Sequence, residues 1–299
     1  MTLPFIGADV GGSKTAVAVG TADHVLGRAL GPGAAVRPGR AIASAATVAE
    51  TIRKALAASG NARGSVLVVG AAGAGRESER RELEQALRTE ALAERVHVTT
   101  DIEIALTAAF EDGPGIVVVA GTGSVVLGRD PEGRMLRRGG YGWQMGDEGS
   151  GYAIGRAALG AVSRAEDGRS PETALTPVLM EATRSIDFDA LVRWAAAAGP
   201  AEVAALAPQV LHTAERGDAV AQGIADYAAR ELSALVLQLA EEFPTGERVG
   251  VALMGGMLAE ERSLRSAVLE KLGTEATLRP LATIVDPTLG ALIQASRLG

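Results

Sequence analysis

The chain is 299 residues long, which is enough for about two domains of ordinary size. Hydrophobic residues make up 47% and charged residues 22%, as in folded globular proteins, so a disordered chain is excluded. The net charge of −7 argues against a nucleic-acid-binding protein, which would carry a basic surface. Because there is no cysteine, disulfides, thiolate nucleophiles and cysteine-held zinc or iron–sulfur sites are excluded as well.

The composition also describes the core and the compartment that we expect. Aromatic residues account for only 3% of the chain, whereas glycine occurs 38 times, so the core must be built mainly from Ala, Val, Leu and Ile. Residues 1–15 contain no basic stretch ahead of an apolar one, and runs such as residues 116–120 are too short to span a bilayer. We therefore expect a cytoplasmic protein with no membrane partner.

The first third of the chain predicts strands separated by tight glycine turns, followed by alternating helices and strands. The predicted elements are strands at 4–10, 15–20 and 25–30, a helix at 41–59, a strand at 65–69, a helix at 77–92, a strand at 96–98 and a helix at 102–110. The helix at 41–59 has helical apolar spacing, and the predicted buried face consists of Ile42, Ala46, Ala49, Ile52 and Leu56.

A strand–glycine turn–strand pattern then starts again. The predicted elements are strands at 115–120 and 125–128, a hairpin turn at 130–133, helices from 151 to 242, strands at 248–254 and 276–280, and a helix at 287–296. Because the pattern occurs twice, near residues 5–20 and 115–128, we expect two related α/β domains with a cleft between them. The predicted boundary lies in the acidic Gly/Pro connector at 111–114.

The two glycine turns do not match the common nucleotide-binding motifs. In the first turn, Ser13 separates Gly12 from Lys14, and a strand follows where a P-loop requires a helix. The second turn, Gly121-Thr122-Gly123, lacks the third glycine of a dinucleotide-binding fingerprint, because position 126 is Val.

The same turns can form a different phosphate site. Backbone N–H groups of such turns make anion-binding concavities, to which Ser13 and Thr122 add hydroxyls and Lys14 adds a positive charge. Asp9, at the end of the first strand, could hold a hydrated Mg²⁺ beside the phosphates. The alternative is that both turns are ordinary glycine hairpins.

A third glycine element, Gly255-Gly256, ends a buried strand and would let a flat ring or a phosphate approach the backbone. Such junctions also occur for packing reasons alone. The three histidines share no metal-ligand spacing, and we expect them to be structural or exposed; they are His24, His97 and His212.

Residues 139–152 concentrate three features that are rare elsewhere in the chain. The segment contains one of the two Trp and two of the three Tyr residues, six glycines and the acidic pair Asp147-Glu148. Ring faces, carboxylate acceptors and close backbone approach together favour recognition of a polyol. The alternative is an ordered loop that packs its own rings.

Asp101 is the candidate general base, because it follows a predicted strand directly and opens a predicted helix. A carboxylate at this place could also be a helix N-cap, which is the more ordinary role. A catalytic role would require a substrate hydroxyl within hydrogen-bonding reach and a γ-phosphate beyond it.

In this order, the three glycine elements resemble the phosphate-1, phosphate-2 and adenosine motifs of the actin-like ATPase and sugar-kinase superfamily. Residues 140–152, which end in Met-Gly-Asp-Glu-Gly-Ser-Gly-Tyr, resemble more narrowly the N-acetylglucosamine kinases grouped with the BadF/BadG/BcrA/BcrD ATPases. The resemblance implies two actin-like ATPase (ribonuclease H-like) domains around a central cleft. We expect residues 1–112 to form the first domain, with the helix at about 287–299 packing back on it, and 113–286 to form the second, with a helical insertion.

The resemblance further implies ATP-dependent phosphorylation of an amino sugar such as N-acetylglucosamine or glucosamine, at O6, by a homodimer that uses Mg²⁺. Asp101 matches the catalytic aspartate, and Asp9 the metal site. The residues implied for ATP are Asp9, Gly11, Gly12, Ser13, Lys14, Thr15, Gly121, Thr122, Gly123, Ala214, Gly255 and Gly256. Those implied for the sugar are Asp101, Ser124, Gly140, Tyr141, Gly142 and Asp147.

The chain departs from the family pattern at two places. The loop at 31–38 lacks the Asn that usually binds sugar hydroxyls, and Tyr141 replaces a frequent Trp. Both changes leave the sugar open, and Arg37 could pair with the carboxylate of a muramic acid instead. A non-kinase ATPase or a sugar sensor of the same fold is a further alternative. A non-catalytic sugar sensor would need neither Asp9 nor Asp101, so the presence of both argues against the sensor. An iron–sulfur activator and a zinc-containing repressor-like kinase are disfavoured because the chain lacks their cysteines.

Overall fold

The computed structural model describes residues 3–21, 23–244, 248–282 and 285–299. The chain divides into two compact units, each with its own five-stranded sheet. Unit 1 consists of Met1–Gly113 together with Val285–Gly299, and unit 2 of Pro114–Ile284. The α/β fold class expected from the sequence is confirmed in both units.

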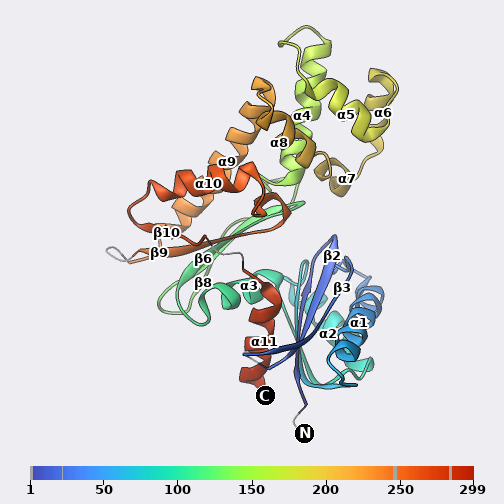
Figure 1. Cartoon of the computed structure of the whole chain (residues 1–299), viewed down its shortest axis with the longest axis vertical. Coiled ribbons are helices and arrows are strands. Elements are labelled where there is room, and N and C mark those ends of the chain that lie inside the picture. The colour runs from blue at the N-terminus through green and yellow to red at the C-terminus, as the bar shows by residue number, and fades with distance from the viewer. Residues whose placement is uncertain (1–2, 22, 245–247, 283–284) are drawn as a thin grey trace. The chain divides into compact units, whose positions relative to one another are not determined.

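The sheet of unit 1 has the strand order β3-β2-β1-β4-β5 (Figure 1). Its strands are β1 (Phe5–Val10), β2 (Lys14–Gly20), β3 (Val25–Pro32), β4 (Gly64–Ala71) and β5 (Ala93–Thr99). The strands β1, β2 and β3 form an antiparallel meander, whereas β1, β4 and β5 run parallel. Parallel strands need crossover helices, which the chain supplies between β3 and β4 and between β4 and β5.

Helices cover both faces of this sheet, as Figure 1 shows. They are α1 (Ala41–Ala58), α2 (Glu77–Thr89), α3 (Asp101–Phe110) and α11 (Pro287–Leu298). In β4, Leu67 and Val69 point to the core under α1 and α2, while Val66 and Val68 point to the core under α3 and α11. This alternation explains why β4 is an almost continuous apolar run.

The helix α11 comes from the end of the chain and packs against the first strand of unit 1 and against α3. A side chain at Gly7 would lie 2.5 Å from the carbonyl oxygen of Thr288, and one at Gly290 would collide with the backbone of α3 at Ile104. Glycine at these two positions therefore lets three backbones approach one another closely.

The sheet of unit 2 repeats the order of unit 1, as β10-β9-β6-β7-β8. Its strands are β6 (Gly115–Ala120), β7 (Ser124–Arg129), β8 (Met135–Gly139), β9 (Val249–Met254) and β10 (Leu278–Pro280). Again the first three strands form an antiparallel meander, and β6, β9 and β10 run parallel. The duplication that the sequence predicts is thus present in the topology.

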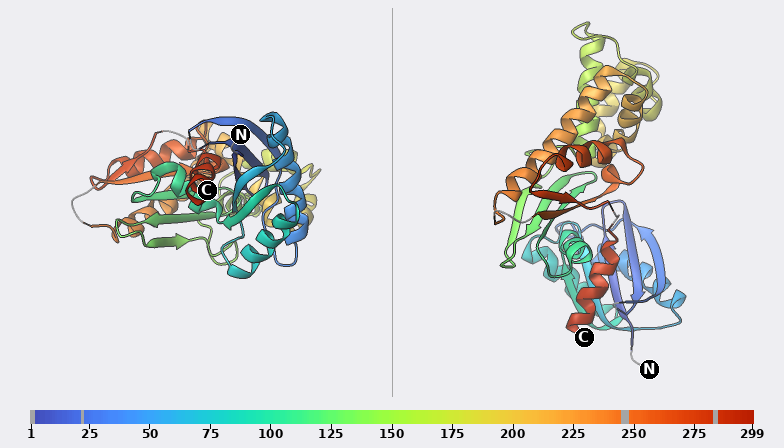
Figure 2. Two further views of the ribbon diagram at one scale, coloured as in Figure 1. Left: turned by 90° about the horizontal axis from the view of Figure 1, so that it is seen from below. Right: turned by 60° about the vertical axis from the view of Figure 1, so that its left-hand side comes forward.

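Unit 2 differs from unit 1 because it has a long helical segment between β8 and β9. Its helices are α4 (Gly151–Glu166), α5 (Leu175–Thr183), α6 (Phe188–Ala197), α7 (Pro200–Ala204), α8 (Ala207–Glu215) and α9 (Ala219–Ala240), followed after β9 by the 3-10 helix η1 (Gly256–Leu258) and α10 (Ser263–Gly273). Figure 2 shows α9 (orange) running from the other inserted helices to the sheet of the same unit, where it packs on β6, β7 and β8. A single apolar core connects sheet and insertion.

The structure differs from the sequence prediction at two elements. In α1, Ile42 is 82% exposed and Ala46 is also exposed, and the face that packs on the sheet instead holds Ala45, Val48 and Ile52. Alanine occurs all around this helix, so the apolar pattern did not single out one face. The strand β8 was not predicted, because it lies at the sheet edge and contains two consecutive arginines, Arg137 and Arg138.

No helix in the described part of the chain has the length and apolarity needed to cross a membrane.

Candidate active site

In unit 1, two carboxylates lie at the carboxyl edge of the parallel strands. Asp9 is in register with Gly70 of β4, and Gly70 is in register with Thr99, the last residue of β5. Asp101 follows Thr99 by two residues and is the first residue of α3. The sheet therefore places Asp9 and Asp101 at one edge, where the ligands of open α/β sheets usually bind.

These two carboxyl groups are electrostatically unusual. Burial, together with the negative charges of Asp101 and Asp286, raises the pKa of Asp9 to about 7, although the positive charge of Lys14 opposes the shift. Burial also raises the pKa of Asp101 to about 6, against the effect of hydrogen bonds from the backbone N–H groups of Asp101 and Ile102. A carboxylate with a pKa just below neutral pH is well suited to accept a proton from a hydroxyl.

Asp101 is not the N-cap of α3, so the more ordinary interpretation of this residue is wrong. The cap is Thr100, whose hydroxyl accepts a hydrogen bond from the N–H of Glu103 (3.2 Å), while the Glu103 carboxylate accepts one from the N–H of Thr100 (3.0 Å). Thr99 also donates its hydroxyl to Glu103. With capping done by Thr100, the carboxylate of Asp101 accepts no side-chain hydrogen bond from another described residue. The spacing Thr-x-x-Glu of a capping box is readable in the sequence and would have identified Thr100 as the cap.

The turn between β1 and β2 is open to solvent. The Gly11 N–H donates to the carbonyl of Lys14 (2.9 Å), and Gly12, Ser13 and Lys14 are all exposed. Thr15, predicted to contact ATP, is instead fully buried, and its hydroxyl donates to the carbonyl of Pro32 (2.8 Å). Its side chain therefore holds β2 against β3, and only its backbone is left for a ligand.

The described residues could hold a magnesium ion only together with substrate phosphates and water. Among the described residues there is no group of three or more Asp, Glu or His side chains that could hold a metal. Mg²⁺ is commonly bound by one or two carboxylates together with substrate phosphates and water. Asp9 fits this role, because burial and nearby negative charges raise the energy of its charged form, and a divalent cation would offset this cost.

In unit 2, the corresponding turn is supported by the start of α4. The N–H of Gly151 donates to the carbonyl of Gly121 (2.8 Å), and the N–H of Tyr152 donates to the carbonyl of Thr122 (3.2 Å). Thr122 itself is exposed. Ser124 is buried, and its hydroxyl donates to the carbonyl of Glu148 (2.7 Å), so this predicted sugar ligand connects the turn to residues 139–152.

Asp147 supports the same turn from the other side. Its backbone is left-handed, with φ 62°, and only 8% of the residue is exposed. Burial raises the pKa of its carboxyl group, and hydrogen bonds from the N–H groups of Ser124 and Gly142 counteract this shift. A Cβ atom at Gly123 would lie 2.6 Å from the Asp147 Oδ2. Asp147 thus joins the predicted ATP turn to the predicted sugar segment, a link that the sequence does not show.

The aromatic side chains of residues 139–152 behave in two ways. The rings of Trp143 and Tyr152 lie 5.2 Å apart at 60°, so this pair packs within the loop, as expected for a loop that packs its own rings. Tyr141 is 68% exposed, and the Arg137 guanidinium lies over its ring, 5.9 Å from the centroid. Tyr141 is therefore free to offer its outer face to a ligand. It stands between Gly140 and Gly142, which both have left-handed backbones.

The residues predicted for the adenine side occupy different environments. Gly255 has φ 93°, and a side chain there would collide with the backbone of Ala120 at the end of β6, so glycine is required for packing. Gly256 has open space around its Cα atom. Ala214 is 7% exposed and belongs to the core of unit 2.

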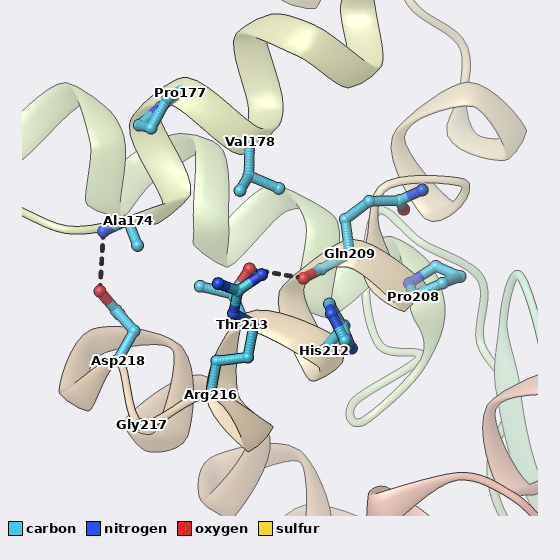
Figure 3. Close-up of a pocket in the computed structure, with 10 residues that line it drawn as sticks. All are labelled: Ala174, Pro177, Val178, Pro208, Gln209, His212, Thr213, Arg216, Gly217 and Asp218. Carbon is cyan, nitrogen blue, oxygen red and sulfur yellow. Dashed lines mark hydrogen bonds between the residues drawn. The ribbon is translucent and has the colours of Figure 1, made fainter.

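A cavity of about 620 Å³ lies next to Ala214 along the chain (Figure 3). Its walls include His212, Thr213, Arg216 and Asp218. Figure 3 shows Asp218 accepting a hydrogen bond from the N–H of Ala174 (2.8 Å), which joins the start of α9 to the segment before α5. Of the three histidines, His212 lines this cavity; His24 and His97 lie in unit 1.

Comparison with known proteins agrees with this architecture. The chain is 32% identical over 85% of its length to the N-acetylmuramic acid/N-acetylglucosamine kinase of Clostridium acetobutylicum, with 85% of that protein covered. It is 30% identical to the N-acetyl-D-glucosamine kinase of Dictyostelium discoideum, with 97% of both chains covered. A crystal structure from Chromobacterium violaceum, assigned as an N-acetylglucosamine kinase, has 28% identity and a TM-score of 0.80, with 98% of both chains covered.

Both units thus have the actin-like ATPase sheet that the resemblance implies. The profile of one protein family matches residues 6–295, which is nearly the whole chain. The protein belongs to the BadF/BadG/BcrA/BcrD ATPase family.

Proposed function

We propose that this protein is an ATP-dependent kinase that transfers the γ-phosphate to a hydroxyl of an amino sugar, with O6 as the acceptor. The observation that carries the proposal is Asp101. Thr100 caps the helix in its place, and the Asp101 carboxylate accepts backbone hydrogen bonds but no side-chain hydrogen bond from another described residue. The carboxyl group lies at the carboxyl edge of the sheet and has a pKa that burial raises to about 6. The names of the two relatives, both kinases of N-acetylated amino sugars, support the substrate class.

In this mechanism Asp101 accepts the proton of the sugar hydroxyl as that oxygen attacks the γ-phosphorus. The bond between the γ-phosphorus and the β–γ bridging oxygen breaks, and ADP leaves. Phosphoryl transfer has a loose transition state, so positioning and charge stabilisation contribute more than the base itself. The exposed turn at residues 11–13 and the turn at 121–123 would bind the phosphates through N–H groups, Ser13 and Thr122. Asp9 would hold the Mg²⁺ that neutralises charge on the β- and γ-phosphates.

The sugar would be held by residues 140–147. Tyr141 would offer its exposed ring face to the apolar face of the sugar, and the flanking glycines would allow backbone groups to approach the hydroxyls. Because the Asp147 carboxylate already accepts two backbone hydrogen bonds, it has limited capacity left for a sugar hydroxyl. The main proposed role of Asp147 is to position Ser124 and Gly142.

The remaining assignments are predictions from the sequence. We propose a homodimer that acts in the cytoplasm, where ATP is available, and adenine binding near Gly256. Size-exclusion chromatography with light scattering tests the homodimer. Hydrogen exchange tests the adenine site, because a bound nucleotide should protect the backbone near Gly256.

The experiment that tests the proposal is a coupled assay of ADP release with ATP and Mg²⁺ over a series of sugars. The series contains N-acetylglucosamine, glucosamine, N-acetylmannosamine, N-acetylmuramic acid and glucose. We expect ADP release that depends on an amino sugar and exceeds the release with glucose. Phosphorus–proton coupling in the NMR spectrum of the product should place the phosphate on C6.

Two results would contradict the proposal. ADP release that no sugar stimulates would exclude a sugar kinase. Equal stimulation by glucose and by every amino sugar would exclude the amino-sugar class while keeping the kinase chemistry.

A further inference from the structure

A small cavity in unit 1 is not used by the proposed mechanism. It has a volume of about 220 Å³ and lies beside the β1–β2 turn. Its walls come from the turn, from the loop after β3 and from the first two turns of α1, and they include Gly12, Ala35, Arg37, Arg40, Ser44 and Thr47. We name it the Arg37/Arg40 cavity.

The cavity combines two positive charges with small neutral walls. No ion pair or side-chain hydrogen bond joins the guanidinium of Arg37 or Arg40 to another residue in the described parts of the chain. By contrast, Arg53, on the same helix as the cavity wall, pairs with Glu90 at 2.5 Å. Two exposed guanidinium groups that share one cavity and lack acidic partners form a site for an anion.

The backbone around the cavity adds to its positive potential. Arg40 precedes the first residue of α1 and makes no side-chain cap, and the first turn of α1 contains no acidic residue. The unpaired N–H groups of a helix N-terminus favour anions and disfavour cations. An anionic ligand would therefore satisfy both the helix end and the two guanidinium groups.

Backbone contacts hold the loop that forms one wall of the cavity against the β1–β2 turn. The N–H of Ala34 donates to the carbonyl of Gly11 (3.1 Å), and a side chain at Gly33 would collide with the backbone of Gly12. The N–H of Val36 donates to the carbonyl of Ala72 (2.8 Å). The loop that presents Arg37 is thus held on both sides by backbone contacts, so the cavity is preformed.

The size of the cavity limits its occupant. Pockets that enclose a whole drug-sized ligand measure about 300–1,000 Å³. A cavity of about 220 Å³ holds a short acidic substituent rather than a whole sugar ring or a nucleoside. A planar carboxylate matches the forked donors of a guanidinium group, which can bind both of its oxygens.

We propose that the Arg37/Arg40 cavity is a subsite for a carboxylate carried by the amino-sugar substrate, such as the lactyl ether of N-acetylmuramic acid. This inference rests on the proposed kinase function and deepens it. It assigns Arg37 and Arg40 as specificity residues that distinguish an acidic amino sugar from a neutral one. The absence of an amide side chain in this loop then follows, because Ala35 leaves room for the substituent.

The test compares N-acetylmuramic acid with N-acetylglucosamine, which lacks only the lactyl group. In Arg37→Ala and Arg40→Ala, we expect the KM for N-acetylmuramic acid to rise by about 10- to 100-fold. The KM values for N-acetylglucosamine and for ATP should change less than about twofold, within the range of minor structural effects. The methyl ester of N-acetylmuramic acid should show the same loss with the unchanged enzyme.

Arg53→Ala is the matched control, because it removes the same charge from the helix that forms one wall of the cavity, at a position outside the cavity. Its KM for both sugars should equal that of the unchanged enzyme. Melting temperatures of all variants show whether folding is affected. Arg37→Lys should recover part of the affinity, since it restores the charge without the fork.

Each contrary result identifies what has failed. A rise in the KM for ATP alone would assign the two arginines to the nucleotide phosphates and overturn the inference. An equal rise for both sugars, or an enzyme that phosphorylates N-acetylglucosamine but not N-acetylmuramic acid, would overturn it too and leave the kinase function intact. ADP release that no sugar stimulates would refute the proposed function itself.

Discussion

The two units of this chain share one sheet topology and differ in where their polar residues lie. In unit 1, Asp9 is the second-last residue of β1 and pairs with Ala16 on the neighbouring strand. The residue at the same place in unit 2 is Val119, second-last in β6, which pairs with Val125. The same sheet topology therefore carries a carboxylate at this position of the carboxyl edge in unit 1 and a valine in unit 2.

The glycine turns of the two units also differ, in how closely other residues pack around them. The turn at 11–13 is exposed, and a methyl group at Gly12 would meet no atom within 4 Å. The turn at 121–123 is enclosed by the start of α4 and by Asp147, and a methyl group at Gly123 would meet the Asp147 carboxylate. Unit 2 thus obtains its polar groups from the segment between β8 and α4 rather than from the strand ends. The proposed function accordingly assigns the base to unit 1 and mainly ligand binding to unit 2.

The largest effect should come from the base in unit 1. Asp101→Asn removes the proton acceptor but keeps the shape, so we expect kcat to fall by about 10²- to 10⁴-fold with little change in the affinity for ATP. Steady-state kinetics and nucleotide titration measure the two quantities. Asp23→Asn, an exposed aspartate of the same unit, is the control and should keep the original kcat. If Asp101→Asn turned over at the normal rate, unit 1 would not be the catalytic one.

The two turns can be compared directly with one methyl group each. In Gly123→Ala, the added Cβ would crowd Asp147, and we expect a loss of about 1–3 kcal/mol in the free energy of unfolding. In Gly12→Ala, the open surroundings should keep the change within about 0.5 kcal/mol. Urea unfolding of both variants measures the difference. Equal losses would mean that the turns are equally packed and would remove the contrast between the units.

The raised pKa values of unit 1 predict a pH dependence of activity. The base works only when ionised, and with a pKa of about 6 its ionised fraction falls by about tenfold from pH 7 to pH 5. Asp9, with a pKa of about 7, is coupled to Asp101, so the observed values belong to the pair. We expect kcat/KM to fall by at least about tenfold over this range, as initial rates in matched ionic strength would show. A flat profile would contradict the assignment.

The same shifts predict a stability effect of defined sign. Because burial raises both folded-state pKa values, the proton stabilises the folded state fully below about pH 4, and this contribution is lost as the pH rises through 6 and 7. Asp101→Asn should therefore raise the melting temperature at pH 8 more than at pH 4.5. A larger rise in melting temperature at pH 4.5 than at pH 8 would show that the folded protein favours the charged form of Asp101.

The smallest effects are expected when the N-cap of α3 or of α4 is removed. Thr100→Ala and Ser150→Ala each remove an N-cap, of α3 and α4 respectively, and each should cost about 1 kcal/mol. Thr100 directly precedes the base, so its variant should lower kcat. Ser150 caps the helix that supports the turn at 121–123, so its variant should raise the KM for ATP. Identical kinetic effects of the two variants would argue against separate roles for the units.

Much of the fold was predictable because its signals are local. Apolar runs ended by glycine turns predicted β1, β6 and β9, and their repetition predicted the duplication. The face of α1 was predicted wrongly at Ile42 and Ala46, since alanine surrounds the helix and the sheet selects which side is buried. The edge strand β8 carries adjacent arginines and gave no apolar pattern.

For the site, local patterns were enough to predict the residue types and their order: carboxylates after strands, three glycine elements and one aromatic, acidic loop. Which of these groups remain available to a ligand depends on the folded structure. It buried the Thr15 hydroxyl against Pro32 and gave the cap of α3 to Thr100. It also turned Asp147 toward the backbone of Ser124 and Gly142. The physical reason is that hydrogen-bond partners and burial depend on residues distant in the chain, whereas strand, turn and helix signals are carried by neighbours.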